Sequence, residues 1–584
     1  MLIFSLMAKH NGSSTGVLSL RPQMEFLKCV VLGTVVFLAA CGQQESNRSY
    51  SMGQVQPPAA SAKVSYYAAS RFAEQAAFGP TQELVAEIQA KGFEKWIDDQ
   101  FALPTTQVDY SSKAALLRDW DMGASERAVW GWYRAQFPHM AIGASDQLRL
   151  RVTWSLSQWI AVSDRRLKPI AVLDWMNLLQ RVALSDYKTI LEQVTKSPSM
   201  GWYLDNSQNR PKSEACPWCA PNENYARELM QLFSIGIVEL NTDGSVKKDA
   251  AGRPIETYTQ RDVEQLAMAL TGWRNQQLAN FVQTKQSQNG TDWAAPMVPD
   301  EWDAAHDWNA KRVMGKRFPA GQNAERDLQT ALSLLISHNN TAPFVSLRLI
   351  QNLVKSNPSP GYIQRVATVF LNNGRGQVGD MKAVVKAVLL DPEAREADDP
   401  SKASKTSGKL REPFQQTIAV WRGIGCQRLP TDIDGNANLN TEQAPFNPES
   451  VFSFYAPTDT ASGTNILAPE QRLLNAQEFN TRLGQLSGLN WSPILRNDED
   501  PNALSMGAAG CDVSSLLAAY RASPTAFQDY LAARFFRGAM PATLRLELTR
   551  VHKELQSKNY LNELAQASSL LQYALLSPYF GAVR

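Results

Sequence analysis

From about residue 64 onward, apolar residues recur every three to four positions, which is the spacing of amphipathic helices. In residues 145–163, for example, Leu148, Val152, Leu156 and Ile160 follow one another at four-residue steps. The same spacing predicts helices in ten segments: 64–78, 82–101, 145–163, 171–197, 222–236, 259–272, 379–390, 512–535, 541–557 and 559–577. Only residues 235–258, with Asp243-Gly244 as turn chemistry, predict a β-hairpin. The pattern therefore predicts an all-α fold: one large multi-helix domain over 64–584 with a short β-hairpin excursion.

The N-terminal region predicts export. Lys28 precedes an unbroken apolar run from Cys29 to Ala40, which has the length of a signal peptide and is too short to span a bilayer as a mature helix. Leu38-Ala39-Ala40-Cys41 resembles a bacterial lipobox. We expect a lipoprotein signal peptide over residues 1–40, with Met24 as the real start, and a lipid on Cys41. An ordinary secretory signal with a nearby cysteine is the alternative.

The segment after Cys41 bears on localisation. Residues 41–63 are polar and rich in Gln, Ser and Pro, so we expect a disordered tether. Gly42 stands where an Asp commonly retains lipoproteins at the inner membrane, and this favours the outer membrane. The expected location is the cell envelope, with membrane attachment through the lipid anchor.

Charge excludes one class of partner. The chain has 58 basic and 56 acidic side chains, a net charge of +2. No surplus of Lys and Arg is present to neutralise phosphates, so we expect no binding to nucleic acid.

Four cysteines lie beyond the expected anchor. Cys216-Pro217-Trp218-Cys219 has the spacing of a redox pair, half a zinc site or a local disulfide. The sequence has no second such pair, which excludes a four-cysteine zinc site. Export favours a disulfide that closes a loop. Cys426 with Cys511 is a candidate for a second, long-range bridge.

Several stretches resemble one family. NENYARELMQLFSIG at 222–236, followed by YTQRDVEQLAMALTGW at 258–273, is similar to the signature of a bacterial exported family of unknown function, number 1800 in the domain-of-unknown-function series. Further blocks agree in order, at 145–163, 198–209, 306–315, 338–354 and 379–392. The resemblance covers about residues 65 to 580. The CPWC insert and a long hairpin at 237–257 depart from the pattern.

The resemblance implies an exported, largely helical protein without an established activity. It also implies an exported partner, because genes of this family often lie beside those of a family resembling sulfatases and alkaline phosphatases. The sequence assigns no cofactor and no metal.

The matched blocks contain many polar residues, which indicates a buried network or a pocket. The candidates for catalysis are Asp205, Glu228, Asp262 and His306. The candidates for binding are Asn206, Asn209, Asn224, Arg227, Trp273, Asp307 and His338. A structural role is the competing interpretation: a solvated helix face for Glu228 and an N-terminal cap for Asp262.

Three functions remain open. The first is a non-enzymatic envelope lipoprotein, a helical scaffold or binding protein that works with the exported partner. The second is an exported hydrolase of envelope or extracellular polymer with a carboxylate and histidine pocket. The third is a thiol–disulfide protein that uses Cys216 and Cys219. Because HExxH, GxSxG and phosphate-cradling loops are absent from the sequence, whether the protein is an enzyme stays open.

Overall fold

The computed structural model describes residues 64–113, 126–278, 290–404, 406–427, 441–488, 513–557 and 562–583. All of them belong to one unit, Met52–Arg584. The expected signal peptide, Cys41 and the tether lie outside the described residues.

Helices dominate these segments. The N-terminal half contains α2 (Tyr66–Ala76), α3 (Gln82–Lys91), α4 (Phe93–Ala102), α6 (Glu126–Gly143), α7 (Gln147–Ser157), α8 (Pro169–Val182), α9 (Tyr187–Thr195), α10 (Pro198–Tyr203), α11 (Asn224–Gln231) and α12 (Gln260–Ala269). The C-terminal half contains α13 (Ala324–Ser337), α14 (Thr341–Leu353), α15 (Pro360–Leu371), α16 (Met381–Leu390), α17 (Pro392–Arg395), α18 (Pro413–Gly423), α19 (Ala476–Gly488), α20 (Val513–Ala522), α21 (Pro524–Phe535), α22 (Ala542–Gln556) and α23 (Glu563–Leu575).

The strands are short and pair only in twos. β1 (Trp273–Arg274) pairs with β2 (Val298–Pro299), β3 (Lys311–Val313) with β4 (Lys316–Phe318), and β5 (Lys409–Leu410) with β6 (Ala582–Val583), each pair antiparallel. In the predicted hairpin, single bridges such as Val238 to Glu256 and Leu240 to Val246 replace continuous strands. The all-α prediction with a β excursion is confirmed.

Local signals set many helix starts. The side chain of Ser65 accepts the Ala68 N–H at the start of α2, and Asp380 accepts those of Lys382 and Ala383 at the start of α16. Proline occupies the first turn of α8, α10, α15 and α21, where its missing N–H costs no hydrogen bond.

Several predicted helices are longer than those in the structure. The segment 82–101 is two helices, because Gly92 between α3 and α4 takes a φ of +76°, which turns the chain. The segment 171–197 is likewise split into α8 and α9, and 512–535 into α20 and α21 at Ser523-Pro524. The helix expected over 145–163 ends at Ser157.

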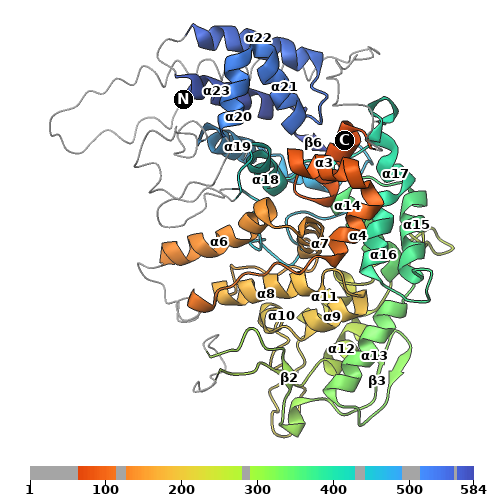
Figure 1. The fold of residues 1–584 in the computed structure, drawn as a ribbon. Coiled ribbons are helices and arrows are strands. Elements are labelled where there is room, and N and C mark those ends of the chain that lie inside the picture. The colour runs from red at the N-terminus through yellow and green to blue at the C-terminus, as the bar shows by residue number, and fades with distance from the viewer. Residues whose placement is uncertain are drawn as a thin grey trace, which may run out of the picture. The chain divides into compact units, whose positions relative to one another are not determined.

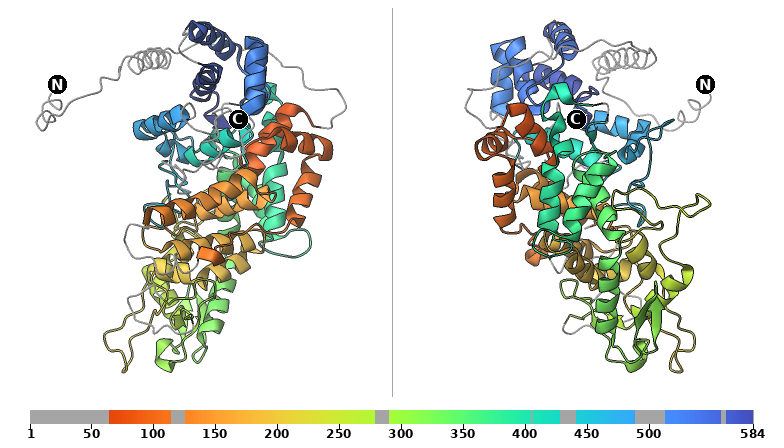
Figure 2. Two further views of the ribbon diagram at one scale, coloured as in Figure 1. Left: turned by 60° about the vertical axis from the view of Figure 1, so that its left-hand side comes forward. Right: turned by 90° about the vertical axis from the view of Figure 1, so that its right-hand side faces the viewer.

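Two hydrophobic cores hold these elements. The larger core draws on α2 to α4, α6 to α16 and the start of α18, and its buried aromatic residues include Trp96, Trp154 and Trp175. The second joins the end of α18 to α20–α23. In all three views α20–α23 gather at one end, and α12, α13 and the β3–β4 hairpin lie at the other (Figures 1 and 2).

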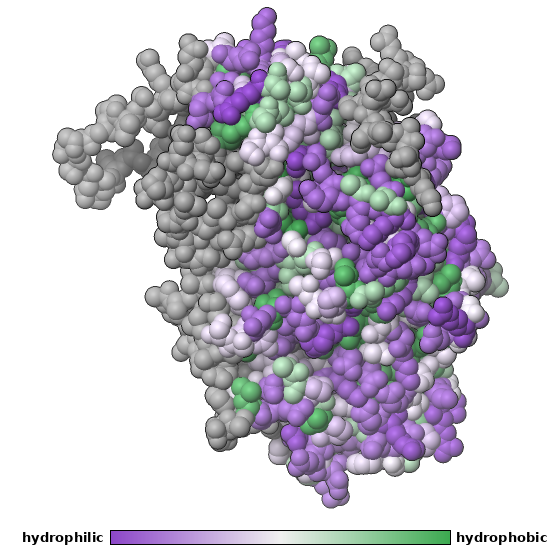
Figure 3. Space-filling model, viewed as in Figure 1, coloured by the Kyte–Doolittle hydropathy of each residue, from purple (hydrophilic) through white to green (hydrophobic). Residues whose placement is uncertain are grey.

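The surface is mixed in character. On the face drawn in Figure 3, hydrophobic residues form small separate spots among hydrophilic ones. Within the described segments, no helix combines the length and the apolar character that crossing a membrane requires.

Candidate functional site

The eleven candidate residues fall into two neighbouring groups and one outlier. We call Asp205, Asn206, Asn209, Asn224, Arg227 and Glu228 the Asp205 cluster. We call His306, Asp307, Lys311 and Asp327, with Thr271, the His306 cluster. Asp262 adjoins the second cluster, Trp273 lies between the two, and His338 is the outlier.

The Asp205 cluster joins the loop after α10 to the start of α11. Asp205 has a φ of +57° and accepts hydrogen bonds from Arg166 at 3.2 Å and from Asn224 at 2.9 Å. Asn209 accepts the Asn222 N–H at 2.7 Å and donates to the Asn222 carbonyl at 3.3 Å. These side chains replace the backbone pairing that the irregular loop lacks, and they hold it against α11.

Arg227 and Glu228 follow on α11. Arg227 donates to Glu223 at 2.6 Å and to Gln260 at 3.0 Å, so it links the starts of α11 and α12. Glu228 is buried, and burial raises the pKa of its carboxyl against the lowering effect of the Arg227 charge. Its Oε2 has no hydrogen-bond partner among the described residues, and neither does either amide atom of the buried Asn206.

Asp262 serves as a cap. Its Oδ2 accepts the Thr259 N–H at 2.8 Å in a capping box at the start of α12. Its Oδ1 accepts the Met314 N–H at 2.6 Å, which fixes the turn of the β3–β4 hairpin. Burial raises the pKa of Asp262, but these hydrogen bonds outweigh it and the pKa is lowered.

The His306 cluster is a buried polar network. His306 Nδ1 lies 2.9 Å from the Thr271 carbonyl oxygen, and Nε2 lies 3.4 Å from Asp327 Oδ2. Lys311 Nζ donates to the same Asp327 oxygen at 2.8 Å and lies 3.6 Å from Asp307 Oδ1. The Asp307 N–H donates to Thr271 Oγ1 at 3.0 Å. The network therefore ties β3 to the N-terminal turn of α13.

Residues 271–273 connect the two clusters. Thr271 contacts His306, the Gly272 N–H donates to the Asn209 carbonyl at 2.9 Å, and the Trp273 carbonyl accepts the Gln208 N–H at 2.7 Å. A Cβ on Gly272 would lie 2.8 Å from His306 Cβ, so the approach of the two segments requires glycine here. The Trp273 ring is buried, and Lys196 Nζ lies 5.7 Å from its centroid.

His338 lies elsewhere. It follows the last residue of α13, eleven positions and about 16 Å along the helix from Asp327. Its Nδ1 accepts the Asn340 N–H at 3.1 Å, and burial lowers its pKa. The tertiary structure thus separates it from the other candidates.

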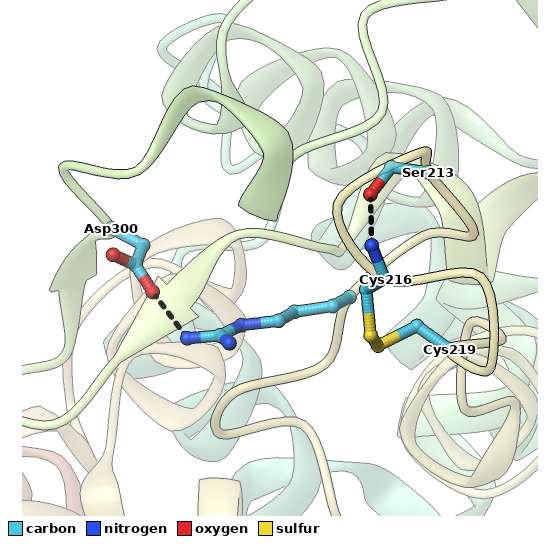
Figure 4. The surroundings of a disulfide bond; sticks show 5 residues. Ser213, Cys216, Cys219 and Asp300 are labelled. Carbon is cyan, nitrogen blue, oxygen red and sulfur yellow. Dashed lines mark hydrogen bonds and ion pairs between the residues drawn. A yellow bond between two sulfur atoms is a disulfide. The ribbon is translucent and has the colours of Figure 1, made fainter.

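The CPWC segment contains a disulfide. Cys216 and Cys219 are bonded, and the Cys216 N–H donates to Ser213 Oγ at 3.1 Å, as Figure 4 shows. Arg210, at the base of this loop, pairs with Asp300 at 3.1 Å. Cys426 is also disulfide-bonded, and its expected partner Cys511 lies outside the described residues.

Sequence reasoning missed a second buried network, around Glu412. Lys409 donates to Glu412 at 2.5 Å, Gln443 donates to the other carboxylate oxygen, and the Arg151 charge lies nearby. Burial raises the pKa of Glu412, but these partners lower it by more, so the pKa lies below its ordinary value. The one available signal was the run of charged residues Lys409, Arg411 and Glu412 directly before α18. Lys311 stood in a matched block, whereas Asp327 carried no sequence signal.

One hollow on the described part of the chain lies away from both clusters. It has a volume of about 420 Å³, lies at α2, α4 and α17, and is lined by Phe93, Arg395 and Asp398 among others. We give it no role in the chemistry, because none of the candidate residues lines it. In the part of the chain that the structure describes, no group of three or more Asp, Glu, His or Cys side chains is arranged to hold a metal ion.

Comparison with known proteins identifies the family. The model of the family described as "Protein of unknown function (DUF1800)" matches residues 71–582. The match covers most of the chain, so the protein belongs to this family. No curated protein and no solved structure matches it.

Proposed function

We propose that this member of the DUF1800 family is a lipid-anchored envelope protein that acts by binding, as a helical scaffold for an exported partner. The lipid on Cys41 would hold it at the outer membrane, and residues 41–63 would let the helical body reach its partner. The partner implied by the family resemblance is a sulfatase-like or phosphatase-like exported protein.

One observation carries the proposal. Two of the candidate acid–base side chains are engaged in structural contacts: Asp262 caps α12 and fixes the β3–β4 turn, and His306 lies beside Asp327 and Lys311. A general acid or base needs a polar atom directed at a substrate. Here those atoms are directed at neighbouring elements, which supports a folding role.

The test is crosslinking in the native envelope. Cells producing the full chain with a C-terminal tag are treated with a membrane-permeant crosslinker, and the tagged protein is purified from membranes. The proposal expects one exported protein in stoichiometric amount. A Cys41→Ala variant is the matched control: it should leave the membrane fraction and lose the partner. Recovery of the tagged chain alone, at normal membrane abundance, would refute the scaffold proposal.

A hydrolase is the second candidate, and Glu228 favours it. The buried carboxyl with a raised pKa and an unpartnered oxygen has the properties of a general acid. This candidate expects the purified protein to release soluble fragments from envelope polymer, and expects Glu228→Gln to abolish that release. Asp262→Asn should reduce stability and release together. A Glu228→Gln variant that releases fragments at the wild-type rate would exclude the hydrolase.

A further inference from the structure

Three tryptophans are exposed to solvent on two neighbouring loops. Trp218 is 81% exposed, Trp302 37% and Trp308 42%. Other large aromatic side chains, among them Trp96 and Trp175, are fully buried in the core. Single exposed apolar residues are common on protein surfaces, so exposure alone indicates little. What distinguishes them is their support: contacts hold the Trp302 and Trp308 rings, and a disulfide constrains the backbone that carries Trp218.

Trp302 and Trp308 are fixed by contacts beneath them. The Arg210 guanidinium lies 4.7 Å from the centroid of the Trp302 ring and is itself held by Asp300 at 3.1 Å. The Trp308 indole N–H donates to the Asp303 carbonyl at 2.8 Å, and its ring meets the His306 ring edge-on at 5.5 Å. Because His306 is anchored in its buried cluster, Trp308 has a rigid support.

The backbone that carries Trp218 is constrained by its own loop. It lies inside the four-residue ring closed by the Cys216–Cys219 disulfide, directly after Pro217. Ser213 and Cys216 exchange two backbone hydrogen bonds, at 3.2 and 3.1 Å, which fold the loop back on itself. The disulfide and the proline both reduce the freedom of the backbone, so less backbone entropy is lost when a ligand binds to this loop.

The two loops are joined at their bases. Trp302 and Trp308 flank the short 3-10 turn Asp303–Ala305, and the Trp308 N–H bonds to that turn. The Arg210–Asp300 ion pair ties the base of the loop that carries Trp218 to the same segment (Figure 4). We call the three indoles with Arg210 and Asp300 the tryptophan surface.

The surface has the chemistry of a carbohydrate site. Its apolar parts are separate ring faces, and the chain between them supplies charged hydrogen-bonding residues, Lys212, Glu214, Glu301 and Asp303. A pyranose ring offers an apolar C–H face to an indole and hydroxyls to polar neighbours.

We propose that the tryptophan surface binds a linear polysaccharide, with sugar faces stacked on Trp218, Trp302 and Trp308 and hydroxyls bonded by the exposed charged residues around them, Glu301 and Asp303 among them. A polymer fits better than a single sugar, because the rings lie on separate loops. This proposal rests on the proposed function, since it names a ligand for a protein that acts by binding. Polysaccharide binding and binding of the exported partner are separate properties in this proposal.

The test is co-sedimentation of the full-length, detergent-extracted protein with chitin, cellulose and purified peptidoglycan sacculi. The proposal expects saturable binding to at least one polymer. It expects Trp218→Ala to weaken that binding about tenfold, the effect of losing one stacking contact. Because Trp218 is almost fully exposed, this variant should fold normally, which near-ultraviolet circular dichroism checks. Phe452→Ala, at an exposed aromatic residue outside the two loops, is the matched control and should bind as the wild type does.

The outcomes separate the two proposals. If the protein binds none of the three polymers and the crosslinked partner is still recovered, the carbohydrate proposal is overturned and the scaffold proposal stands. Polymer binding that survives the combined change of Trp218, Trp302 and Trp308 to alanine overturns the tryptophan surface. Loss of the crosslinked partner in Trp218→Ala, without any polymer binding, would assign the surface to a protein and also overturn the proposal.

Discussion

Replacing Asp327 with asparagine tests whether the His306 cluster is structural. The carboxylate is fully buried and accepts hydrogen bonds from Lys311 at 2.8 Å and from Gln322 at 2.5 Å. The Lys311 side chain is only 1% exposed, so in Asp327→Asn its ammonium group would lose its closest counter-charge and could not regain water without disrupting β3. We expect this variant to fold but to be markedly less stable.

The magnitude follows from the burial of both charges. Breaking a buried ion pair by removing one partner costs about 3–5 kcal/mol, because the remaining charge is left uncompensated. A domain of about 500 residues that unfolds as one unit has an unfolding entropy of about 1 kcal/mol per kelvin. The melting temperature should therefore fall by about 3–5 °C.

The assay is thermal unfolding followed by near-ultraviolet circular dichroism, for Asp327→Asn, Lys311→Met and the double variant. The double variant should be more stable than the sum of the two single losses predicts, since it removes both charges of the Lys311–Asp327 pair together. Arg521→Met is the matched control: it breaks an exposed pair with Glu563 at 2.8 Å, which should change stability by less than about 0.5 kcal/mol.

The pH dependence gives an independent check. Burial raises the pKa of Asp327, but hydrogen bonds from His306, Lys311 and Gln322 outweigh it, so the pKa lies below its ordinary value of 3.8. A carboxylate with a lowered pKa stabilises the folded state above its ordinary pKa and loses this effect as the pH falls through the folded-state pKa. The stability gap between wild type and Asp327→Asn should be constant near neutrality and narrow below about pH 4. Additive single changes, or a gap that does not change with pH, would refute the structural assignment.

Three further predictions address the anchor, the disulfide and Glu228. Cys41→Ala should move the protein from the membrane to the soluble fraction, and mass spectrometry should show the loss of the lipid; a protein that stays on the membrane unmodified would disprove the anchor. Changing Cys216 and Cys219 together to serine should cost only about 2 kcal/mol, because the disulfide closes a very short loop; calorimetry measures this, and rapid alkylation of the native wild type after mild reduction would favour the thiol–disulfide function. Because burial raises the pKa of Glu228, its ionisation destabilises the folded state above the ordinary value of 4.5. Glu228→Gln should therefore be more stable than the wild type at pH 7 and gain nothing at pH 4, and a variant less stable at both would contradict the burial argument.

Much of the helical framework could be read from the chain. The N-terminal cap at Asp262 was predicted as one interpretation and is confirmed, and the Asp380 cap of α16 is equally local, because a cap involves residues two or three positions apart. The helix expected over 222–236 is shorter than predicted: α11 begins at Asn224 and ends at Gln231, and Asn222 accepts the Asn224 N–H. The long segment 82–101 contained its own break at Gly92, which periodicity alone does not reveal.

The candidate site was harder to predict. The sequence grouped Asp205, Asn224 and Glu228 with His306 because all lie in matched blocks, and the structure places the blocks side by side through residues 271–273. The sequence did not indicate that Asp327 would contact His306 and Lys311, nor that Arg151 would approach Glu412. These contacts join helices, strands and loops that lie far apart in the sequence. The periodic spacing of apolar residues within one segment does not show which other segment it contacts.

The sequence by itself determined where helices form, which of their faces are apolar and which two cysteines could close a local ring. Each of these depends on residues a few positions apart, so the chain encodes them locally. The tertiary structure decided which polar side chains are buried, which of them become partners, and which tryptophans remain in water. These properties depend on how apolar faces pack across the whole domain, because packing fixes the distance and solvent exposure of groups far apart in the sequence.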